Sequence, residues 1–169
     1  MNILQDLKPR FPIAAAPLQT SPLHILHVVR AGKGHGGMEQ GIVNVTAAIP
    51  SAKYRFSICA LDQEETFTQR VRRADMKCYA LPKNGKGVYW SYVPQLARLF
   101  RHIGVDIIHS HCWGTFLYSV LAARITRIPI IHGEHGKNFY ELNERNRAKD
   151  WTKTVLGPRV DTLLTVSDT

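Results

Sequence analysis

The chain alternates between short apolar runs and longer segments in which apolar residues recur at helical spacing. Six of the runs are typical of strands because they are short and bounded by polar, glycine or proline residues. They cover residues 23–29, 54–61, 77–82, 105–111, 128–136 and 161–168. The segments between most of them are long enough for helical crossovers, so the pattern predicts a parallel sheet.

The helical spacing is clear in the segment that follows residue 37. Four apolar residues there step by four, three and four, which places them on one face of a helix: Met38, Ile42, Val45 and Ile49. Pro50 is expected to end this helix. Further helices are predicted over about 91–103, 115–125 and 151–156. Ser91 is expected to cap the first of these through its side chain, and Gly104 to end it.

Strands and helices in this order predict an α/β fold, a Rossmann-like parallel sheet with helices on both faces and right-handed crossovers. In such folds ligands gather at the carboxyl ends of the strands. Polar and glycine residues collect at three of these ends, in residues 32–37, 109–113 and 132–137. We therefore expect one composite site made from three loops.

Composition narrows the class of protein. A chain of 169 residues with 44% hydrophobic and 21% charged residues suits one globular domain, and no apolar run approaches the roughly 20 residues of a membrane span. We expect residues 1–21 to form a loosely ordered arm and residues 22–169 the domain. The three cysteines form no C-x-x-C pair, which favours a reducing, cytoplasmic compartment.

The net charge of +9 comes from positive residues that are spread along the chain. The densest cluster, residues 70–73, lies among acidic and polar residues without interleaved aromatics, so no nucleic-acid partner is expected. Anionic substrates or anionic lipid headgroups suit this charge equally well. The segment 137–150 mixes aromatic and basic residues. It reads either as a solvated loop or as a lip that faces an acceptor or the inner face of a membrane.

The stretch VVRAGKGHGGMEQGIVNV, residues 28–45, reads as a strand, a glycine loop and a helix. Glycines let the backbone approach a phosphate, and the following helix N-terminus favours negative charge. The glycines at 32, 34 and 37 match G-x-G-x-x-G, and Asp62 follows the second strand. A dinucleotide-binding domain of an oxidoreductase therefore stays open, as does a simple tight turn. Glu39 also suits the first turn of a helix on electrostatic grounds alone.

Four of the eight histidines fall at two strand ends: His109, His111, His132 and His135. His109 and His111 should share a face because side chains alternate along a strand. Together with Cys112, Glu134 and His135 these histidines could form a zinc site, but no segment carries H-E-x-x-H or paired cysteines. We therefore expect no metal. His24 and His27, at odd spacing in the first strand, should lie on opposite faces and serve the structure.

Four motifs together resemble one family. GGMEQGIVNV resembles the G-G-x-E loop and helix of the family 4 (group 1) retaining GT-B glycosyltransferases, and DIIHSHCWG resembles their fourth strand. IPIIHGEHG resembles their fifth strand, and VDTLLTVSD the strand that ends in V-S-D or V-S-E. The motifs occur in the family's order over residues 23–169. The HGEHG form is similar to sugar transferases of exopolysaccharide pathways.

The resemblance implies the N-terminal, acceptor-side domain of an enzyme that moves a sugar from a nucleotide-sugar donor to a glycan or lipid-linked acceptor. Gly36 and Gly37 would present N–H groups to the donor's diphosphate, with Glu39 as the acidic residue of the G-G-x-E loop. His135 would reach the transferring sugar as the catalytic residue. His111 and Glu134 would line the cleft near the acceptor.

The resemblance further implies no cofactor and no obligatory metal. The family's second domain, which carries most donor contacts, is not found in these 169 residues. We therefore expect this chain alone to have no appreciable transferase activity. We expect a cytoplasmic protein, with peripheral contact at the inner face of the membrane as an open alternative.

Overall fold

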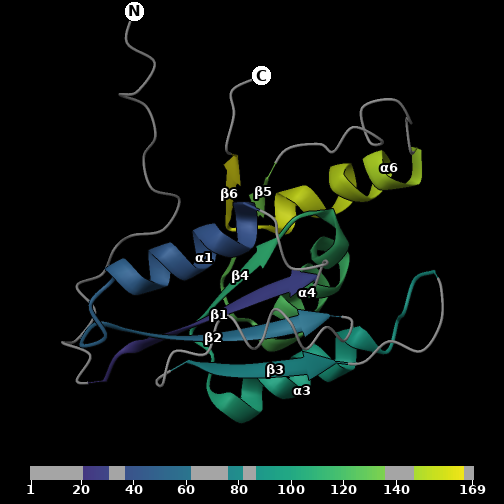
Figure 1. Cartoon of the computed structure of the whole chain (residues 1–169). Helices are drawn as coiled ribbons and strands as arrows, with labels where there is room; N and C mark the ends of the chain where they lie inside the picture. Colours follow the sequence, from purple (N-terminus) through teal and green to yellow (C-terminus); the bar gives the residue numbers. More distant parts are fainter. Residues whose placement is uncertain (1–20, 31–36, 62–75, 82–86, 136–146, 166–169) are drawn as a thin grey trace, which may run out of the picture.

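The computed structural model describes residues 21–30, 37–61, 76–81, 87–135 and 147–165. Its centre is a six-stranded sheet in the order β3-β2-β1-β4-β5-β6, in which every pair of neighbouring strands is parallel (Figure 1). The strands are β1 (Leu23–Arg30), β2 (Tyr54–Leu61), β3 (Lys77–Leu81), β4 (Ile107–His111), β5 (Ile130–Glu134) and β6 (Thr162–Thr165). The predicted Rossmann-like parallel sheet is thus confirmed.

Helices cover both faces of this sheet. They are α1 (Gly37–Ala48), α3 (Tyr92–Ile103), α4 (Trp113–Thr126) and α6 (Arg147–Leu156), with the short 3₁₀ helix η2 (Gly157–Arg159) after the last. In Figure 1 α1 lies above the sheet and α3 below it. α4 packs beside α3 and contacts β1, β4 and β5. The prediction of helices on both faces is therefore also correct.

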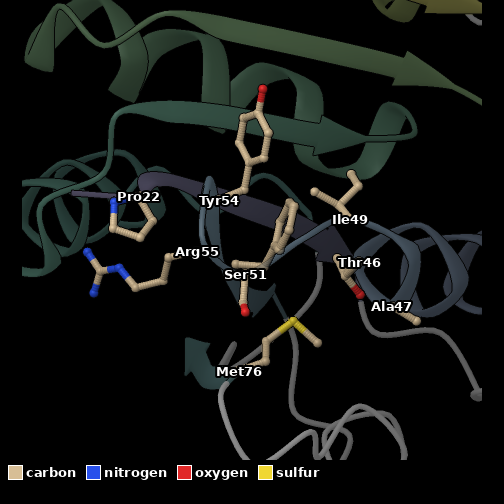
Figure 2. A pocket seen from close by; sticks show the side chains of 9 residues that line it. Pro22, Thr46, Ala47, Ile49, Ser51, Tyr54, Arg55 and Met76 are labelled. Carbon is tan, nitrogen blue, oxygen red and sulfur yellow. The ribbon is translucent and has the colours of Figure 1, made fainter. Parts of the chain in front are cut away.

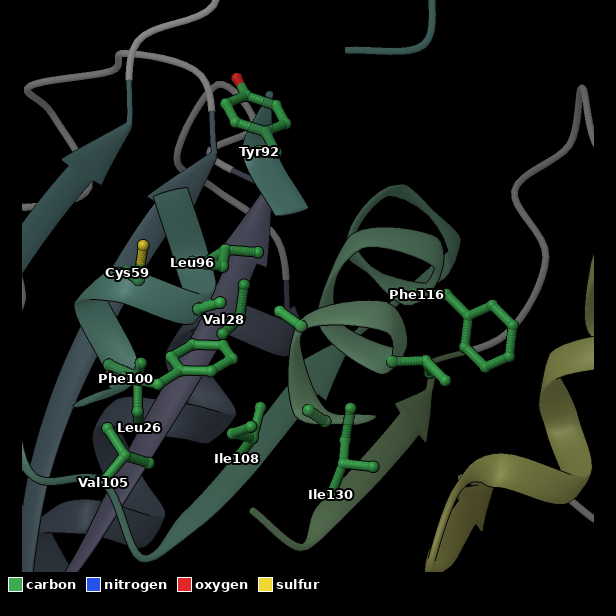
Figure 3. Packing of buried hydrophobic residues seen from close by; sticks show 14 of the residues in the cluster. Leu26, Val28, Cys59, Tyr92, Leu96, Phe100, Val105, Ile108, Phe116 and Ile130 are labelled. Atoms are coloured by element: carbon green, nitrogen blue, oxygen red, sulfur yellow. The ribbon is translucent and has the colours of Figure 1, made fainter. Parts of the chain in front are cut away.

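Each face has its own apolar core. The larger one joins α3 and α4 to the sheet, and Figure 3 shows Phe100 and Leu96 of α3 against Leu26 and Val28 of β1. The smaller one lies under α1, where Ile42 packs with buried residues of β1 and β2. Because side chains alternate along β1, Leu26 and Val28 face α3 and α4, and His27 faces the α1 side.

The ends of α3 explain part of what the sequence indicated. Gly104 caps the helix in the left-handed conformation (φ 64°), and its N–H is directed to the carbonyl groups of Phe100 and Arg101, as expected of a glycine that ends a helix. The predicted capping by Ser91 is wrong. Ser91 occupies the N-cap position, but its side chain makes no capping hydrogen bond, and its Oγ instead accepts one from Gln95 Nε2 at 3.1 Å.

Other differences lie at the boundaries and on α1. β4 begins at residue 107 rather than 105, α4 at 113 rather than 115, and α6 at 147 rather than 151. β5 and β6 begin at residues 130 and 162, later than the apolar runs from 128 and 161 that predicted them. On α1 the expected apolar stripe is only partly buried, because Val45 is 52% exposed whereas Ile42 is 4% exposed.

Candidate functional site

The strand register gathers histidines at the carboxyl ends of the central strands. His27 of β1 is the direct partner of His109 of β4, and His111 of β4 is the partner of Gly133 of β5. All these positions lie on the α1 face of the sheet, as does His135, two residues after Gly133. Residues 27, 109, 111 and 135 therefore form one group, which we call the histidine cluster.

The rings of the cluster are joined by short nitrogen–nitrogen contacts. His27 Nδ1 lies 2.9 Å from His111 Nε2, and His111 Nδ1 lies 2.9 Å from His135 Nε2. Both distances are those of hydrogen bonds. The ring of His109 stands beside that of His111, with centroids 4.1 Å apart. The predicted shared face of His109 and His111 is thus confirmed.

Gly133 makes room for this arrangement. A Cβ atom at that position would lie 3.0 Å from His135 Nε2, 3.4 Å from His109 Nε2 and 3.5 Å from His111 Nδ1. Three ring nitrogens therefore converge over the space that a side chain would fill. A glycine here permits the close approach of the rings rather than an unusual backbone conformation.

Burial lowers the pKa values of three members of the cluster, His27, His109 and His111. Loss of hydration lowers the pKa of His27 from 6.5 to about 3, and the neighbouring His109 lowers it further. The pKa of His109 falls to about 4, chiefly by burial and then by the charges of His135 and His132. Burial, followed by the neighbouring histidines, lowers the pKa of His111 far below its usual range. Neutral imidazoles each offer one N–H donor and one lone pair.

The turn that follows β4 is strained. Cys112 has φ 60° and ψ 164°, a region that residues other than glycine rarely adopt. The turn is held from both sides, because Cys112 N–H donates to Gly133 O at 2.8 Å and Thr115 Oγ1 donates to His111 O at 2.7 Å. Strained backbone that the surrounding structure fixes is frequent at functional sites.

Glu134 lies apart from the histidine cluster. It alternates with Gly133 and His135 along β5 and so faces the opposite side, where Lys153 Nζ of α6 lies 2.7 Å from its Oε2. His132 Nε2 is 3.6 Å from the same oxygen. The interactions with His132 and then Lys153 lower the pKa of Glu134 to about 2, although burial alone would raise it. The structure thus brings His111 and His135 together but not Glu134 with them.

The amino end of α1 approaches the cluster side of the sheet, where Cys112 Sγ lies 3.5 Å from Met38 Sδ. Gly37 is the first residue of α1 and is exposed. Gly36 lies outside the described residues, as does most of the glycine loop. Glu39 lies in the first turn of α1, and the position of its side chain is likewise outside what is described.

Two hollows in the described part of the chain lie at opposite ends of the sheet. The larger, of about 480 Å³, is lined by residues from the end of α1 and the start of β2, among them Thr46, Tyr54 and Arg55 (Figure 2). It lies at the amino end of the sheet, away from the histidine cluster. The smaller, of about 190 Å³, is lined among others by Arg30 at the end of β1 and Trp113 at the start of α4.

Residues 35–169 match the profile of the family described as Glycosyltransferase Family 4, which is most of the chain. The chain belongs to glycosyltransferase family 4. A comparison with curated protein sequences finds no match.

Solved structures share the fold of this family 4 chain. It resembles HepE (Alr3699) of Anabaena in complex with UDP and glucose at 14% identity and TM-score 0.60, over 82% of this chain and 36% of HepE. It resembles a glycosyltransferase of Rickettsia africae at 20% identity and TM-score 0.64, over 87% of this chain and 37% of that glycosyltransferase. It resembles MurG of Acinetobacter baumannii at 16% identity and TM-score 0.59, over 85% of this chain and 41% of MurG. The family 4 chain is thus an N-terminal GT-B domain that spans less than half the length of these structures.

The sequence predicts a structural role for His27 in this family 4 chain and does not indicate its contacts. The structure places His27 against His111 and in register with His109. His24, on the opposite face, fits its predicted structural role, because its Nε2 lies 2.7 Å from Ser57 Oγ and its Nδ1 2.9 Å from Gly104 O.

Among the described helices, none has the length and apolar character that a membrane span requires.

Proposed function

We propose that this chain is the acceptor-side domain of a retaining glycosyltransferase that moves a sugar from a nucleotide-sugar donor to a glycan or lipid-linked acceptor. The observation that carries the proposal is the contact between His111 Nδ1 and His135 Nε2 at 2.9 Å, beside the amino end of α1. The strand order reverses between β1 and β4, and ligands of open α/β sheets bind at such a switch point.

The amino end of α1 suits the diphosphate of the donor. Main-chain N–H groups at Gly36 and Gly37, together with the helix dipole, would stabilise the negative charge of a departing nucleoside diphosphate. A nucleotide-sugar donor is supported by the HepE structures, which contain UDP, UDP and glucose, or UDP-glucose. Glu39, in the first turn, would belong to the same binding region.

His135 would act on the transferring sugar as the catalytic residue. Its Nε2 lies 2.9 Å from His111 Nδ1, and this contact fixes one nitrogen of the ring. Fixing one ring nitrogen sets the tautomer and the orientation of an imidazole. His111 would thus position His135 near the acceptor. Glu134, which is held by Lys153, would line the acceptor side at a greater distance from the cluster.

The proposal includes a route for the acceptor and a surface for contact with a membrane. A glycan or lipid-linked acceptor would approach between the turn after β4 and α6, where Lys149 Nζ lies 5.4 Å from the Trp113 ring centroid. Trp151 of α6 is 68% exposed, which suits contact with an acceptor or with a membrane surface. The aromatic residues of segment 137–146 that also suggested such a lip lie outside the described residues.

The experiment uses the full-length protein that carries this domain, with UDP-glucose as the first donor probe and release of UDP as the readout. We expect His135→Gln to lower the rate roughly 100-fold or more, as loss of a positioned catalytic side chain does. His102→Gln is the matched control because His102 is exposed in the last turn of α3. Equal rates for the two variants would contradict the role of His135. Retention is read from the anomeric configuration of the product.

Two further results bear on the alternatives. The 169-residue chain spans 36–41% of the HepE and MurG structures, and we expect it alone to show no appreciable turnover of a nucleotide sugar. Turnover by this chain would contradict that expectation. Tight binding of NAD(P) would instead favour the dinucleotide-binding alternative, in which Asp62, outside the described residues, contacts the ribose.

A further inference from the structure

The histidine cluster has a property that sugar transfer does not use. One ring nitrogen from each of His27, His109 and His111 lies within 4.8 Å of the other two. The three residues come from two adjacent strands, and His27 and His109 are direct partners in the sheet. The sheet itself, rather than a mobile loop, therefore holds the three rings together.

Two ring nitrogens of these three histidines make no hydrogen bond within the described part of the chain. His27 Nε2 and His109 Nε2 are buried and have no hydrogen-bond partner among the described residues. A buried polar atom without a partner costs free energy, and native structures rarely keep one without a reason. An unpartnered imidazole lone pair is also what a metal ion binds.

The chemistry of the three side chains suits a metal. Neutral imidazole is a preferred ligand of zinc, copper and nickel. Three histidine ligands with a fourth position open to water or substrate form a known type of zinc site. In the described residues no carboxylate belongs to the group, which excludes a calcium or magnesium site of the usual kind.

The geometry requires only a small closure of the rings. Zinc–nitrogen bonds of about 2.0–2.1 Å in a tetrahedron place the ligand nitrogens about 3.3 Å apart. The nitrogens now lie within 4.8 Å of one another, so they need to close by at most about 1.5 Å. Ligation by His111 Nε2 would replace its hydrogen bond with His27. His111 Nδ1 would remain hydrogen bonded to His135, as the second nitrogen of a ligating histidine usually is.

We propose that His27, His109 and His111 form a binding site for a divalent transition metal of the zinc class, with His135 as the hydrogen-bond partner that orients His111. The site departs from the expectation of no metal, which rested on the absence of H-E-x-x-H and of paired cysteines and did not include His27, the residue that the register of β1 and β4 brings beside His109. The site shares His111 and His135 with the proposed sugar transfer, but its evidence is the geometry of the three rings and does not rest on that function.

The test measures metal binding directly on the untagged 169-residue chain. Isothermal titration with ZnCl₂ at pH 7.5 should show one ion per chain. Co²⁺ as a spectroscopic substitute should give the visible absorption of a tetrahedral site. His109→Gln should weaken zinc binding roughly 100-fold or more, because loss of a direct ligand exceeds the effect of losing an outer-shell partner. His102→Gln, on the exposed side of α3, should bind zinc as the unmodified chain does.

A second readout protects against variants that do not fold. Zinc should shift the ring nitrogen resonances of His27, His109 and His111 in the unmodified chain, while those of His24 should stay in place. Absence of one-to-one binding, or equal zinc affinity in the unmodified chain and a folded His109→Gln variant, would overturn the proposal. Since no substrate is present, neither result depends on the proposed transferase function.

Discussion

His27 Nδ1 and His111 Nε2 lie 2.9 Å apart although the two residues are 84 positions apart in the sequence. A neutral imidazole has one N–H, so a proton on His27 Nδ1 places the protons of His111 and His135 on their Nδ1 atoms in turn. The opposite direction would leave a buried, unpaired N–H at His27 Nε2. The first direction is favoured because buried N–H groups without a partner are rare.

Replacement of His27 should destabilise the chain through His111. His27→Phe keeps a buried aromatic ring but leaves His111 Nε2 without its partner, in a residue that is 2% exposed. We expect a loss of about 1–3 kcal/mol in the free energy of unfolding, the cost of an unsatisfied buried polar atom. Urea denaturation measures it, with His102→Phe as the exposed control. Equal stability of the two variants would mean that the His27–His111 contact contributes nothing.

Gly133→Ala should displace the His135 ring because the added methyl group would collide with it. The new Cβ would lie 3.0 Å from His135 Nε2, so the ring must move by a few tenths of an ångström or more. In the full-length protein we expect transfer to slow about tenfold or more, because small misplacements of catalytic groups are costly. Gly157→Ala is the matched control, since nothing lies within 4 Å of its added Cβ. An unchanged rate for Gly133→Ala would argue against His135 as a positioned catalytic residue.

Acid should destabilise the domain partly through Glu134. Its pKa is about 2 in the folded chain and 4.5 in the unfolded one, so the unfolded state takes up more protons between these values. The stabilising contribution is complete above pH 4.5 and is lost as the pH falls toward 2. Between pH 6 and pH 3 we expect a loss of about 2 kcal/mol from this group.

Glu134→Gln provides the check on that pH dependence. The glutamine variant should lose less stability than the unmodified chain over the same pH range, as measured by denaturant unfolding at each pH. Asp150→Asn serves as control because Asp150 is an exposed acidic residue of α6. Parallel pH profiles for the unmodified chain and Glu134→Gln would show that Lys153 and His132 do not hold the carboxylate as the structure indicates.

Two glycine-to-alanine substitutions should change the stability of the chain in opposite directions. Gly104 has φ 64°, where a Cβ is strained, so Gly104→Ala should destabilise by about 1 kcal/mol. Gly41 lies inside α1 with no atom within 4 Å of an added Cβ, so Gly41→Ala should stabilise by about 0.5–1 kcal/mol. Thermal unfolding of the two variants measures both. Equal shifts would show that backbone conformation does not decide these positions.

The sheet and its helices could be predicted because local patterns determine them. Each strand is a short apolar run, and Gly104 marks a helix end by its conformational freedom alone. The ends of elements were less predictable because tertiary contacts decide them. Asp106, for example, lies just before β4. Its carboxylate accepts a hydrogen bond from His24 N–H, and its own main-chain N–H donates to His24 O, so the strand pairing starts only at Ile107.

The site was predictable only in part. His109 and His111 could be paired from their spacing along one strand. The contact of His27 with His111 depends on which residues of β1 and β4 are partners, and a sequence does not specify that register. In the same way, alternation along β5 separates Glu134 from His135, although the two are neighbours in the HGEHG motif.

β6 has a consequence for the behaviour of the chain in solution. It is the outermost strand next to β5, it carries no charged residue from Thr162 to Thr165, and Leu163 and Leu164 are 61% and 47% exposed on its two faces. An apolar, uncharged edge strand is a template for pairing with strands of other molecules. The 169-residue chain should therefore aggregate as its concentration rises, and a lysine in place of Leu163, the register partner of His132 on the face opposite the histidine cluster, should suppress this.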